Sequence, residues 1–339
     1  MFKPKRVLFE RDALEYQLGK ELQRKFKEEK IPVGLIASHN RVTGIPGRTP
    51  GEAYREAKQT LVVGVRRTLQ FSPCKPSAHY QLPLGTSCSG HCQYCYLQTT
   101  LGKKPYVRVY VNVAEILQQA AKYITERAPE ITVFEGAATS DPLPVEPYTG
   151  TLARTVEFFS LQPLGRFRFV TKFTDVDGLL NTEHNGHTRF RFSINTQHII
   201  KSYEYGTPAA KARLHAARRV AEAGYPLGFL IAPIFIYPGW QDDYTALIRN
   251  LAGELRGYPP EGITFELISH RFTRSAKKRI MEVFPATTLP MEKSGRKFKF
   301  GQFGYGKYVY PKERLLEMDE LFRRELGKHF PGAKVEYLV

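Results

Sequence analysis

From Tyr80 onward, short apolar runs rich in β-forming residues alternate with longer amphipathic runs. The β-like runs are YQLPL, ITVFEG, RFRFVTKF, TRFRFSIN, LGFLIAPIF and GITFELISH, and the intervals between them include VAEILQQAAKYITERA and PAAKARLHAARRVAEAG. Six such units in succession predict parallel strands joined by crossover helices. This alternation restricts the chain to the α/β class, as a barrel or as an open doubly wound sheet.

Two different regions flank this series. Before it, a charged amphipathic run at 11–29 and the apolar runs VGLIAS and TLVVGV predict a small α/β lobe. After it, RKFKFGQFGYGKYVYP predicts a hairpin, and the run at 312–328 predicts a closing helix. We therefore expect an N-terminal lobe at 1–75, a barrel domain at 76–285 and a C-terminal hairpin and helix at 286–339.

The charge balance points to an anionic partner. The 339 residues include 50 Lys and Arg against 33 Asp and Glu, which gives a net charge of +17. Nucleic acid is the commonest partner of such a chain, with a membrane surface as the alternative. No apolar run reaches the roughly 18 residues of a spanning helix, and the start MFKPKRVLFERDALEYQ has no apolar signal segment. We expect a soluble cytoplasmic protein.

Three of the four cysteines lie within eight residues of one another. Cys88, Cys92 and Cys95 have the spacing C-x3-C-x2-C and follow the first strand of the series, at the end of the strands where α/β folds place their chemistry. A zinc site would need a fourth ligand such as His91 or Cys74. We interpret the trio as ligands of a four-iron cluster whose last iron accepts a ligand from outside the protein, with structural zinc as the alternative.

This motif, with an aromatic residue just before its last cysteine, resembles the radical S-adenosylmethionine superfamily. A narrower resemblance, to the spore photoproduct lyases, rests on GTSCSGHCQYCYLQTT, VFEGAATSDP, VTKF and RFSIN and extends over nearly the whole chain. It implies a partial (β/α)6 barrel that binds a 4Fe-4S cluster and S-adenosyl-L-methionine. It also implies a lyase reaction in which a 5′-deoxyadenosyl radical removes hydrogen from a methylene-bridged thymine dimer in DNA and two thymines are restored.

The resemblance also implies a set of cofactor-binding residues, most of them at strand ends. These are Glu135, Gly136, Ser140, Lys172, Ser193, Asn195 and Ala232. A carboxylate at Glu135 suits the amino group of the cofactor, and a cation at Lys172 suits its carboxylate. The ordinary alternative is that Ser193 and Asn195 form strand-end hydrogen bonds and that Lys172 is a solvated charge.

One position departs from the family. Where the lyases have EGACTSDP this chain has EGAATSDP, so Ala138 replaces the cysteine that donates hydrogen in the family. A methyl group offers no weak bond to hydrogen, and we expect this chain to form the substrate radical but to repair it poorly. We interpret Ala138 as an engineered substitution, with a natural variant as the alternative. The fourth cysteine, Cys74, has no motif context and suggests a small buried apolar residue.

Tyrosines stand on both sides of Cys95. The resemblance implies that a tyrosine here relays a hydrogen atom between the spent donor and the cofactor, and we favour Tyr96 over Tyr94. Plain aromatic packing beside the motif is the alternative.

The basic aromatic tail is the expected contact with DNA. Its candidate residues are Arg296, Lys297, Lys299, Phe303, Tyr305, Lys307 and Tyr308. Such a hairpin offers partners for phosphates and faces for base stacking while the lesion is turned out of the helix. A solvated surface hairpin is the alternative.

The expected partners are lesion-bearing DNA and an electron donor such as flavodoxin or ferredoxin, and the expected state is a monomer in the cytoplasm of a spore or germinating cell. Two other functions stay open. A radical enzyme acting on RNA or a small molecule would share the cluster, and a zinc-bearing nucleic-acid-binding module would share the charge and the cysteines.

Overall fold

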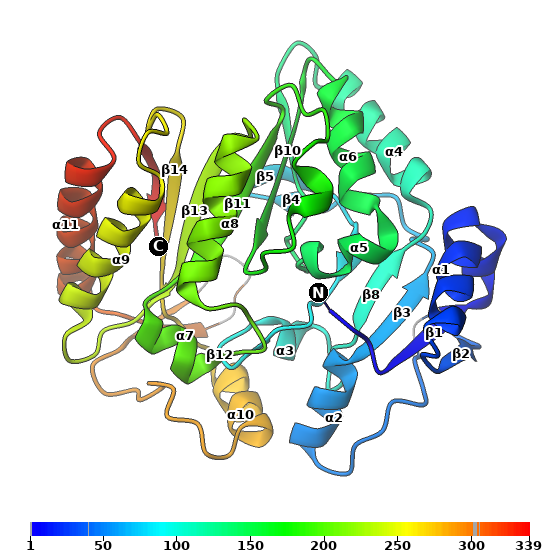
Figure 1. The fold of residues 1–339 in the computed structure, drawn as a ribbon. Helices are drawn as coiled ribbons and strands as arrows, with labels where there is room; N and C mark the ends of the chain where they lie inside the picture. The colour runs from blue at the N-terminus through cyan, green and yellow to red at the C-terminus, as the bar shows by residue number, and fades with distance from the viewer. Residues whose placement is uncertain (1, 40, 301–303, 305) are drawn as a thin grey trace. The chain divides into compact units, whose positions relative to one another are not determined.

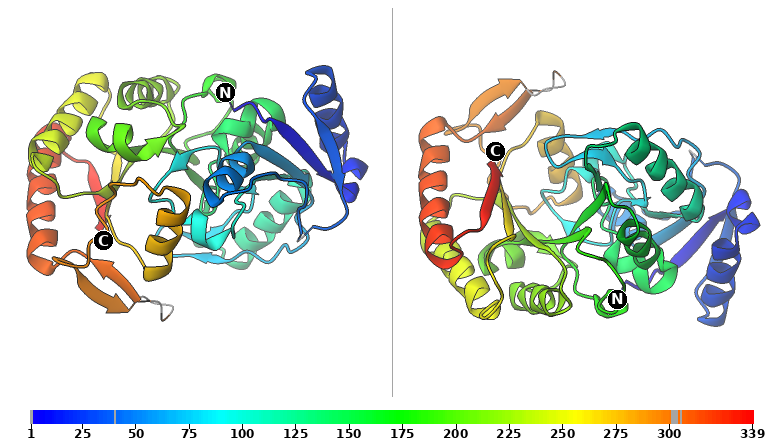
Figure 2. Two further views of the ribbon diagram at one scale, coloured as in Figure 1. Left: turned by 90° about the horizontal axis from the view of Figure 1, so that it is seen from below. Right: turned by 90° about the horizontal axis from the view of Figure 1, so that it is seen from above.

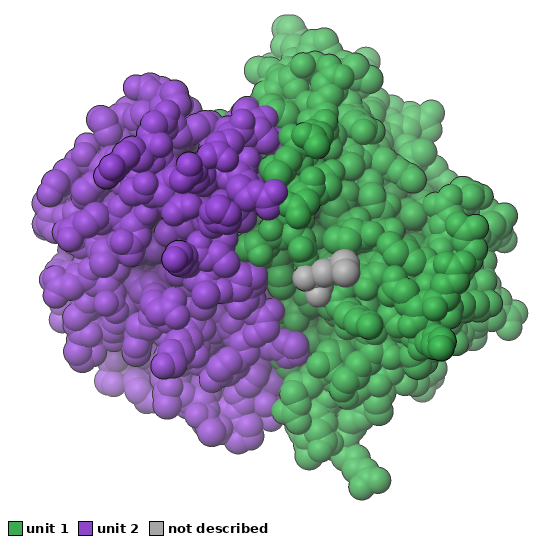
Figure 3. All heavy atoms as spheres, viewed as in Figure 1, with its two compact units in different colours: residues 1–90, 100–190 green, residues 91–99, 191–339 purple. Residues whose placement is uncertain are grey.

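A computed structural model describes residues 2–39, 41–300, 304 and 306–339 (Figure 1). The chain forms two compact units, coloured separately in Figure 3. Unit 1 contains residues 1–90 and 100–190, and unit 2 contains residues 91–99 and 191–339. The limits of the three predicted domains remain a prediction.

Unit 1 contains a five-stranded sheet with the order β2-β1-β3-β8-β6. Its strands are β1 (Arg6–Glu10), β2 (Val33–Ile36), β3 (Thr60–Gly64), β6 (Gly85–Thr86) and β8 (Val107–Tyr110). All pairs are parallel except β6 with β8. The first three strands, with η1 (Arg11–Glu15), α1 (Gln17–Glu28) and α2 (Pro50–Lys58), form the predicted α/β lobe. We did not predict that β6 and β8 extend this sheet.

The larger sheet has the order β17-β14-β13-β11-β10-β9-β5-β4. Its strands are β4 (Pro73–Cys74), β5 (Ala78–Gln81), β9 (Thr132–Glu135), β10 (Gly165–Thr171), β11 (Thr188–Ile194), β13 (Leu227–Ile234), β14 (Thr264–Ser269) and β17 (Lys334–Leu338). β9 pairs in parallel with β5 and β10, and β14 with β13 and β17, as the alternation predicted. The division between the units falls within β11. We did not predict β17.

The intervals between the strands form helices at or near the predicted positions. They are α3 (Leu97–Thr100), α4 (Val113–Glu126), η2 (Leu143–Val145), α5 (Glu146–Thr149), α6 (Thr151–Ser160), η3 (Asp177–Leu179), α7 (Gln197–Tyr203), α8 (Ala210–Glu222), α9 (Trp240–Glu254), α10 (Arg274–Val283) and α11 (Lys312–His329). In α4, Val113, Ile116, Leu117, Ala120 and Ile124 are buried. Their spacing of three or four residues places them on one face of the helix, which explains why the segment is helical.

Aromatic side chains form the core of unit 1. Phe167 and Phe169 alternate with Arg166 and Arg168 along β10, and of these four residues the two phenylalanines are buried, because successive side chains of a strand point to opposite faces. Phe167 stacks on Phe159 with ring centroids 5.4 Å apart, and Phe169 lies 4.5 Å from Phe190. This core supports the β9 and β10 ends that carry several predicted site residues.

The basic tail folds as expected. β15 (Lys297–Phe300) and β16 (Gly306–Val309) form an antiparallel hairpin, and α11 follows it. Figure 2 shows this hairpin in orange, standing out from the body of unit 2. Within the described residues, no helix combines the length and the apolar character needed to cross a membrane.

A buried ion pair links three strands of unit 2. The Nη1 atom of Arg191 on β11 lies 2.9 and 2.7 Å from the two carboxylate oxygens of Glu266 on β14, and the Tyr337 hydroxyl of β17 donates to Glu266 over 2.7 Å. Gly228 on β13 leaves room for this pair, because a Cβ there would lie 2.9 Å from Arg191 Cγ. The absence of a side chain at Gly228 thus leaves space for a buried ion pair in a core that is otherwise mainly apolar.

We predict that Glu266→Leu lowers the free energy of unfolding by about 3–5 kcal/mol, because it leaves the Arg191 guanidinium buried without its carboxylate. The double variant Glu266→Leu, Arg191→Met should recover most of the loss, since neither charge then remains buried. Urea unfolding followed by circular dichroism measures both. Equal losses in the single and double variants would contradict the electrostatic explanation.

Candidate active site

The predicted cluster ligands are divided between the two units. Cys88 belongs to unit 1, and Cys92 and Cys95 belong to unit 2, so each part of the motif is described by itself. All four cysteines lie in the described part of the chain, and none forms a disulfide. Within that part, no three His, Cys, Asp or Glu side chains are gathered as ligands of a single metal ion. The cluster and its ligands therefore remain a prediction.

In unit 1, a buried lysine holds the backbone at Cys88. Lys58, which is 1% exposed, donates from Nζ to the Cys88 carbonyl over 2.9 Å and to Ser87 Oγ over 3.2 Å. Ser87 has a positive φ of 66° and donates its N–H to the Thr139 carbonyl over 2.7 Å. These contacts fix the turn that leads into the motif and place a positive charge beside it.

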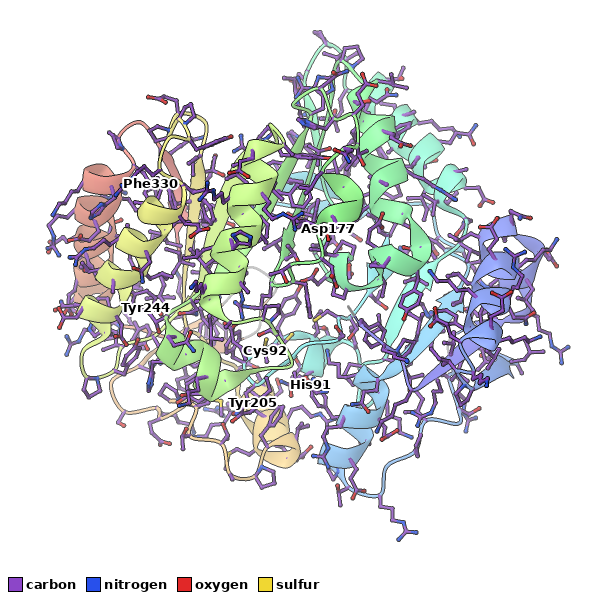
Figure 4. The ribbon with its side chains drawn as sticks, viewed as in Figure 1. His91, Cys92, Asp177, Tyr205, Tyr244 and Phe330 are labelled. Atoms are coloured by element: carbon purple, nitrogen blue, oxygen red, sulfur yellow. The ribbon has the colours of Figure 1, made fainter. Side chains whose placement is uncertain are left out.

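In unit 2, Cys92 and Cys95 lie on one tight turn. The short strand β7 (His91–Cys92) pairs with β12 (Glu204–Tyr205), which places Cys92 opposite Glu204, and Figure 4 labels Cys92, His91 and Tyr205. The Cys95 N–H donates to the Cys92 carbonyl over 3.2 Å, and the side-chain amide of Gln98 donates to the same carbonyl over 3.1 Å. The backbone of the motif is thus held by hydrogen bonds that do not use the sulfur atoms.

A buried charge pair supports the turn that contains Cys92 and Cys95, which we call the cysteine turn. Arg213 on α8 lies 2.6 Å from the Glu204 carboxylate, and both side chains are inaccessible to solvent. The same guanidinium donates to the Ser193 carbonyl over 3.0 Å and to Thr207 Oγ1 over 2.8 Å, and the Tyr94 hydroxyl donates to the other Glu204 oxygen. One ion pair therefore connects β12, the end of β11 and the cysteine turn.

The two tyrosines beside Cys95 lie in different surroundings. Tyr94 is bound to Glu204, and burial together with the Glu204 charge raises the pKa of its hydroxyl well above its usual value. Tyr96 is 56% exposed. The more accessible phenol is the one we favoured for the relay, although the relay itself remains a prediction.

Glu135 ends β9 and is 3% exposed. One of its carboxylate oxygens accepts the Ser77 hydroxyl over 2.8 Å and lies 3.7 Å from Arg168 Nε, and the other accepts the Ala137 N–H over 3.1 Å. The next residue, Gly136, is needed for packing, because a Cβ there would lie 2.6 Å from the Phe167 ring. The conformation after β9 is thus fixed by this carboxylate and by the aromatic core.

Asp141, to which we assigned no role, joins the end of β9 to the end of β10. One of its oxygens accepts the Thr171 hydroxyl and the Lys172 N–H, each over 3.0 Å. Burial raises the pKa of Asp141 to about 6. Ser140, just before it, pairs with Ser87 across an isolated parallel bridge and lies near the Cys88 turn. Three predicted unit 1 positions, Cys88, Ser140 and Lys172, are thus brought to one end of the strands.

A cavity of about 220 Å³ in unit 1 contains Ala138 in its wall. Its lining also includes Gly136 and Thr139 from the segment after β9, and Phe71, Ser72 and Gln81 from β5 and the segment before β4. Cys74 follows two residues after Ser72 and is partly exposed, whereas we expected a buried apolar residue.

In unit 2, the remaining predicted cofactor residues lie at the ends of β11 and β13. Asn195 is fully buried, donates to the Pro233 carbonyl over 2.8 Å and accepts from the Thr196 N–H and the Tyr244 hydroxyl. Ser193 contributes its carbonyl to Arg213. These bonds connect the two strand ends beside Ala232, which precedes Pro233.

The predicted DNA residues are partly exposed and partly structural. Lys297 and Lys299 are exposed and Lys307 is half-buried, but Tyr308 is 7% exposed and stacks on Phe272 at 5.2 Å. Arg296 lies 3.5 Å from the Tyr310 ring centroid and donates to the His270 carbonyl over 2.7 Å. Phe303 and Tyr305 lie outside the described residues.

Sequence reasoning missed the exposed aromatics of the hairpin, Phe298 and Phe300, which are 43% and 70% exposed. The alternation KFKF was the available signal. It also missed an open cavity of about 610 Å³ beside the hairpin, because its lining comes from separate segments. The lining residues are Phe272, Arg274, Lys277, Lys278, Met281, Glu282, Lys293 and Tyr308.

The raised pKa of Asp141 predicts how the stability of the folded chain changes with pH. Between about pH 4 and 6 the carboxyl is still protonated in the folded chain but ionised in the unfolded chain, so its contribution to stability falls as pH rises through this window. The melting temperature of the unsubstituted chain minus that of Asp141→Asn should therefore decrease from pH 4 to 6 and stay level above pH 6. An increase over that window would contradict the burial of this carboxyl.

Comparison with known proteins gives one consistent result. The sequence model of the family described as spore photoproduct lyase matches residues 2–339. Spore photoproduct lyase of Geobacillus sp. is 52% identical over 100% of this chain and 99% of the relative, and that of Bacillus subtilis is 50% identical over the same shares. Spore photoproduct lyase of Clostridium acetobutylicum is 47% identical over 99% of this chain and 98% of the relative.

Solved structures agree with these relatives. A structure of spore photoproduct lyase complexed with dinucleoside spore photoproduct has a TM-score of 0.97 at 52% identity. A double mutant of the lyase, cysteine to alanine and serine to cysteine, with bound AdoMet and dinucleoside spore photoproduct, has a TM-score of 0.97 at 53% identity. Each match covers 100% of this chain and 99% of the solved chain. They confirm the predicted partial barrel.

The mutated positions in these structures have the same spacings as certain residues of this chain. The two substitutions of the double mutant are separated by the same number of residues as Cys74 and Ala138. A tyrosine-to-phenylalanine mutant of the lyase is substituted at a position whose separation from the mutated cysteine equals that of Tyr96 from Ala138. Since the family model spans 2–339 and the relatives are about half identical over their full length, this chain belongs to the spore photoproduct lyase family.

Proposed function

We propose that this chain is a DNA repair lyase that converts the methylene-bridged thymine dimer, spore photoproduct, back to two thymines. The observation that carries the proposal is the match over the whole chain to a lyase structure complexed with the dinucleoside form of that lesion. The basic charge of +17 supports DNA as the natural carrier of the lesion.

The proposed cofactors are a 4Fe-4S cluster on Cys88, Cys92 and Cys95 and S-adenosyl-L-methionine on its open iron. The donor set suits such a cluster, because it consists of three thiols whose backbone is held by hydrogen bonds that do not use sulfur. The Lys58 ammonium beside Cys88 suits the negative charge of thiolate ligands. When bound, these cofactors supply the 5′-deoxyadenosyl radical that removes hydrogen from the lesion.

The chain's own residues would position the cofactor and exclude water. Gly136, Ser140 and Lys172 of unit 1 lie at or after the strand ends that Glu135 and Asp141 hold in place. In unit 2, Ser193, Asn195 and Ala232 lie at strand ends joined by the Asn195 amide. Since Glu135 is already engaged by Ser77 and Ala137, its part in cofactor binding includes fixing the backbone after β9.

Tyr96 is the proposed relay for hydrogen, with Tyr94 as a support. The exposed phenol of Tyr96 is accessible for transfer, whereas Tyr94 is committed to Glu204 and helps to hold the turn between Cys92 and Cys95. A tyrosine mutant of the lyase with matching spacing supports this choice.

Ala138 makes the return of hydrogen to the product radical the weak step of this chain. Its methyl group lies in the wall of the unit 1 cavity, at the position where the family carries its hydrogen-donor cysteine. A C–H bond of a methyl group is too strong to quench a carbon radical, so repair should lag behind the formation of that radical. Natural lyases and cysteine-to-alanine mutants provide the two reference cases.

We predict that Ala138→Cys increases the thymine formed per cofactor cleaved, by roughly tenfold or more. Anaerobically reconstituted protein is given reductant and a lesion-bearing oligonucleotide, and thymine and cleaved cofactor are quantified together. Ala138→Ser serves as the matched control, because its O–H bond does not replace the S–H bond. No gain with Ala138→Cys would overturn the donor assignment, and a colourless zinc-loaded protein would favour the binding-module alternative.

The hairpin is the proposed contact with DNA. Lys297 and Lys299 offer exposed ammonium groups, and Phe298 and Phe300 offer exposed rings. Partial burial, together with the nearby charges of Arg271 and Lys299, lowers the pKa of Lys307. A phosphate at this place would relieve that repulsion.

We predict that the double variant Lys297→Ala, Lys299→Ala weakens DNA binding and makes the slope of log affinity against log salt shallower by about one to two. Phe298→Ala should weaken binding without changing the slope. The matched control is Lys122→Ala on α4, an exposed cation of unit 1. Fluorescence anisotropy over a salt series measures all of these. The same change of slope in the control would contradict a hairpin contact.

The remaining elements of the proposal concern the cell. We place the protein in the cytoplasm of a spore or germinating cell as a monomer, served by an electron donor such as flavodoxin or ferredoxin. A radical enzyme with an RNA or small-molecule substrate is the alternative, and it would show cofactor cleavage that does not respond to lesion DNA.

A further inference from the structure

Lys58 is a buried cation of unit 1 for which the described part of the chain supplies no carboxylate. It is the last residue of α2 and is 1% exposed. Its Nζ atom donates to the Cys88 carbonyl over 2.9 Å and to Ser87 Oγ over 3.2 Å, and it lies 5.5 Å from the centroid of the Tyr54 ring. These partners are two neutral dipoles and one aromatic face, so none of them balances the full charge of the ammonium.

Such a charge is costly, and the chain treats its other buried cations differently. Arg213 lies 2.6 Å from the Glu204 carboxylate, and Arg191 lies 2.7 Å from that of Glu266. Burial of a cation without an anion costs several kcal/mol, and buried charges in proteins are therefore usually paired. The surroundings of Lys58 thus suit an anion that is not one of the described carboxylates.

The carboxylates near the Lys58 segment are engaged elsewhere. Glu56, on the same helix, pairs with Arg6 at 2.5 Å. Asp141 donates its backbone N–H to the Ser87 carbonyl over 3.3 Å, but its carboxylate accepts the Thr171 hydroxyl over 3.0 Å. Neither can serve as the partner of Lys58 without giving up its own bonds.

The backbone around Lys58 is fixed, so the ammonium stays beside the first cysteine of the motif. Ser87 donates its hydroxyl to the Pro105 carbonyl over 2.8 Å and its N–H to the Thr139 carbonyl over 2.7 Å. Lys58 in turn holds the carbonyl of Cys88 itself. Whatever the Cys88 sulfur binds therefore lies within the length of one residue of a buried positive charge.

Resting on the proposed function, we propose that Lys58 is the countercharge of the 4Fe-4S cluster and raises its reduction potential. A four-iron cluster on three thiolates is negative, and one further electron makes it more negative; net charge, hydrogen bonds and exposure set the potential of such clusters. A cation shielded from water stabilises the more negative state more strongly. The electron comes from the reduced flavodoxin or ferredoxin proposed above, and Lys58 neither gains nor loses a proton.

Three variants separate the charge from the hydrogen bonds. Lys58→Met removes both the charge and the donor, Lys58→Gln removes the charge but offers an amide donor, and Lys58→Arg keeps the charge. Lys20→Met removes an exposed cation of α1 and serves as the matched control. All are reconstituted anaerobically without DNA, and the midpoint potential of the cluster is measured by redox titration followed by electron paramagnetic resonance.

We expect Lys58→Met and Lys58→Gln to lower the reduced-to-oxidised ratio at a fixed potential by roughly tenfold, which corresponds to a midpoint about 59 mV more negative. Lys58→Arg should retain most of the original potential. Lys20→Met should leave it unchanged, because water and salt screen an exposed charge.

A second readout concerns the hold on iron rather than the potential. Oxidised protein is mixed with an iron chelator, and the release of iron is followed by absorbance. The two uncharged variants should release iron roughly tenfold faster or more, as expected when a group that supports metal ligands is removed. Melting temperatures of the metal-free chains show whether each variant is folded, and Lys58→Gln carries the test if Lys58→Met is not.

An unchanged potential in Lys58→Gln, or an equal fall in Lys58→Arg, would overturn the proposal, because Lys58 would then act only through hydrogen bonds or packing. Failure of the proposed function has a different signature. If the unsubstituted chain holds no iron–sulfur cluster, the function and this inference both fall. If it holds the cluster but does not cleave the cofactor in response to the lesion, only the function falls, and the potentials still decide the role of Lys58.

Discussion

The buried pair between Glu204 and Arg213 is the interaction on which the cysteine turn depends. Both side chains are inaccessible to solvent, and the pair is satisfied by Tyr94, Thr207 and the Ser193 carbonyl. Charges buried in this way are stable only when their geometry is well fixed. The pair therefore imposes one arrangement on β12, α8 and the end of β11, and through β12 on Cys92.

Carboxylates have a similar structural role in unit 1, where they accept hydrogen bonds from the backbone N–H groups of the segments that carry the predicted site residues. Glu135 holds the segment with Gly136 and Ala138, and Asp141 holds the end of β10 at Lys172. Under the proposed function, such rigid surroundings would help to exclude water from the site and to restrain a radical.

The basic aromatic tail contains two kinds of residue: some pack inside unit 2, and others are exposed on its surface. Arg296 and Tyr308 are used inside unit 2, against Tyr310, His270 and Phe272. Lys297 and Lys299 remain available, together with the Phe298 and Phe300 rings. A partner would thus meet a small charged and aromatic face that is anchored by its neighbours, which limits the entropy lost on binding.

The sequence by itself determined the fold class, the cysteine motif, the family and the hairpin with its closing helix, because these are written in local periodicity and fixed spacings. It also located Ala138 and Tyr96. Only the tertiary structure showed that Lys58 supports Cys88, that Asp141 and Glu204 hold the site segments and that Ala138 lines a cavity together with Phe71 and Ser72. Contacts between residues far apart in the chain leave no periodic pattern, since they depend on which strand ends the fold brings together.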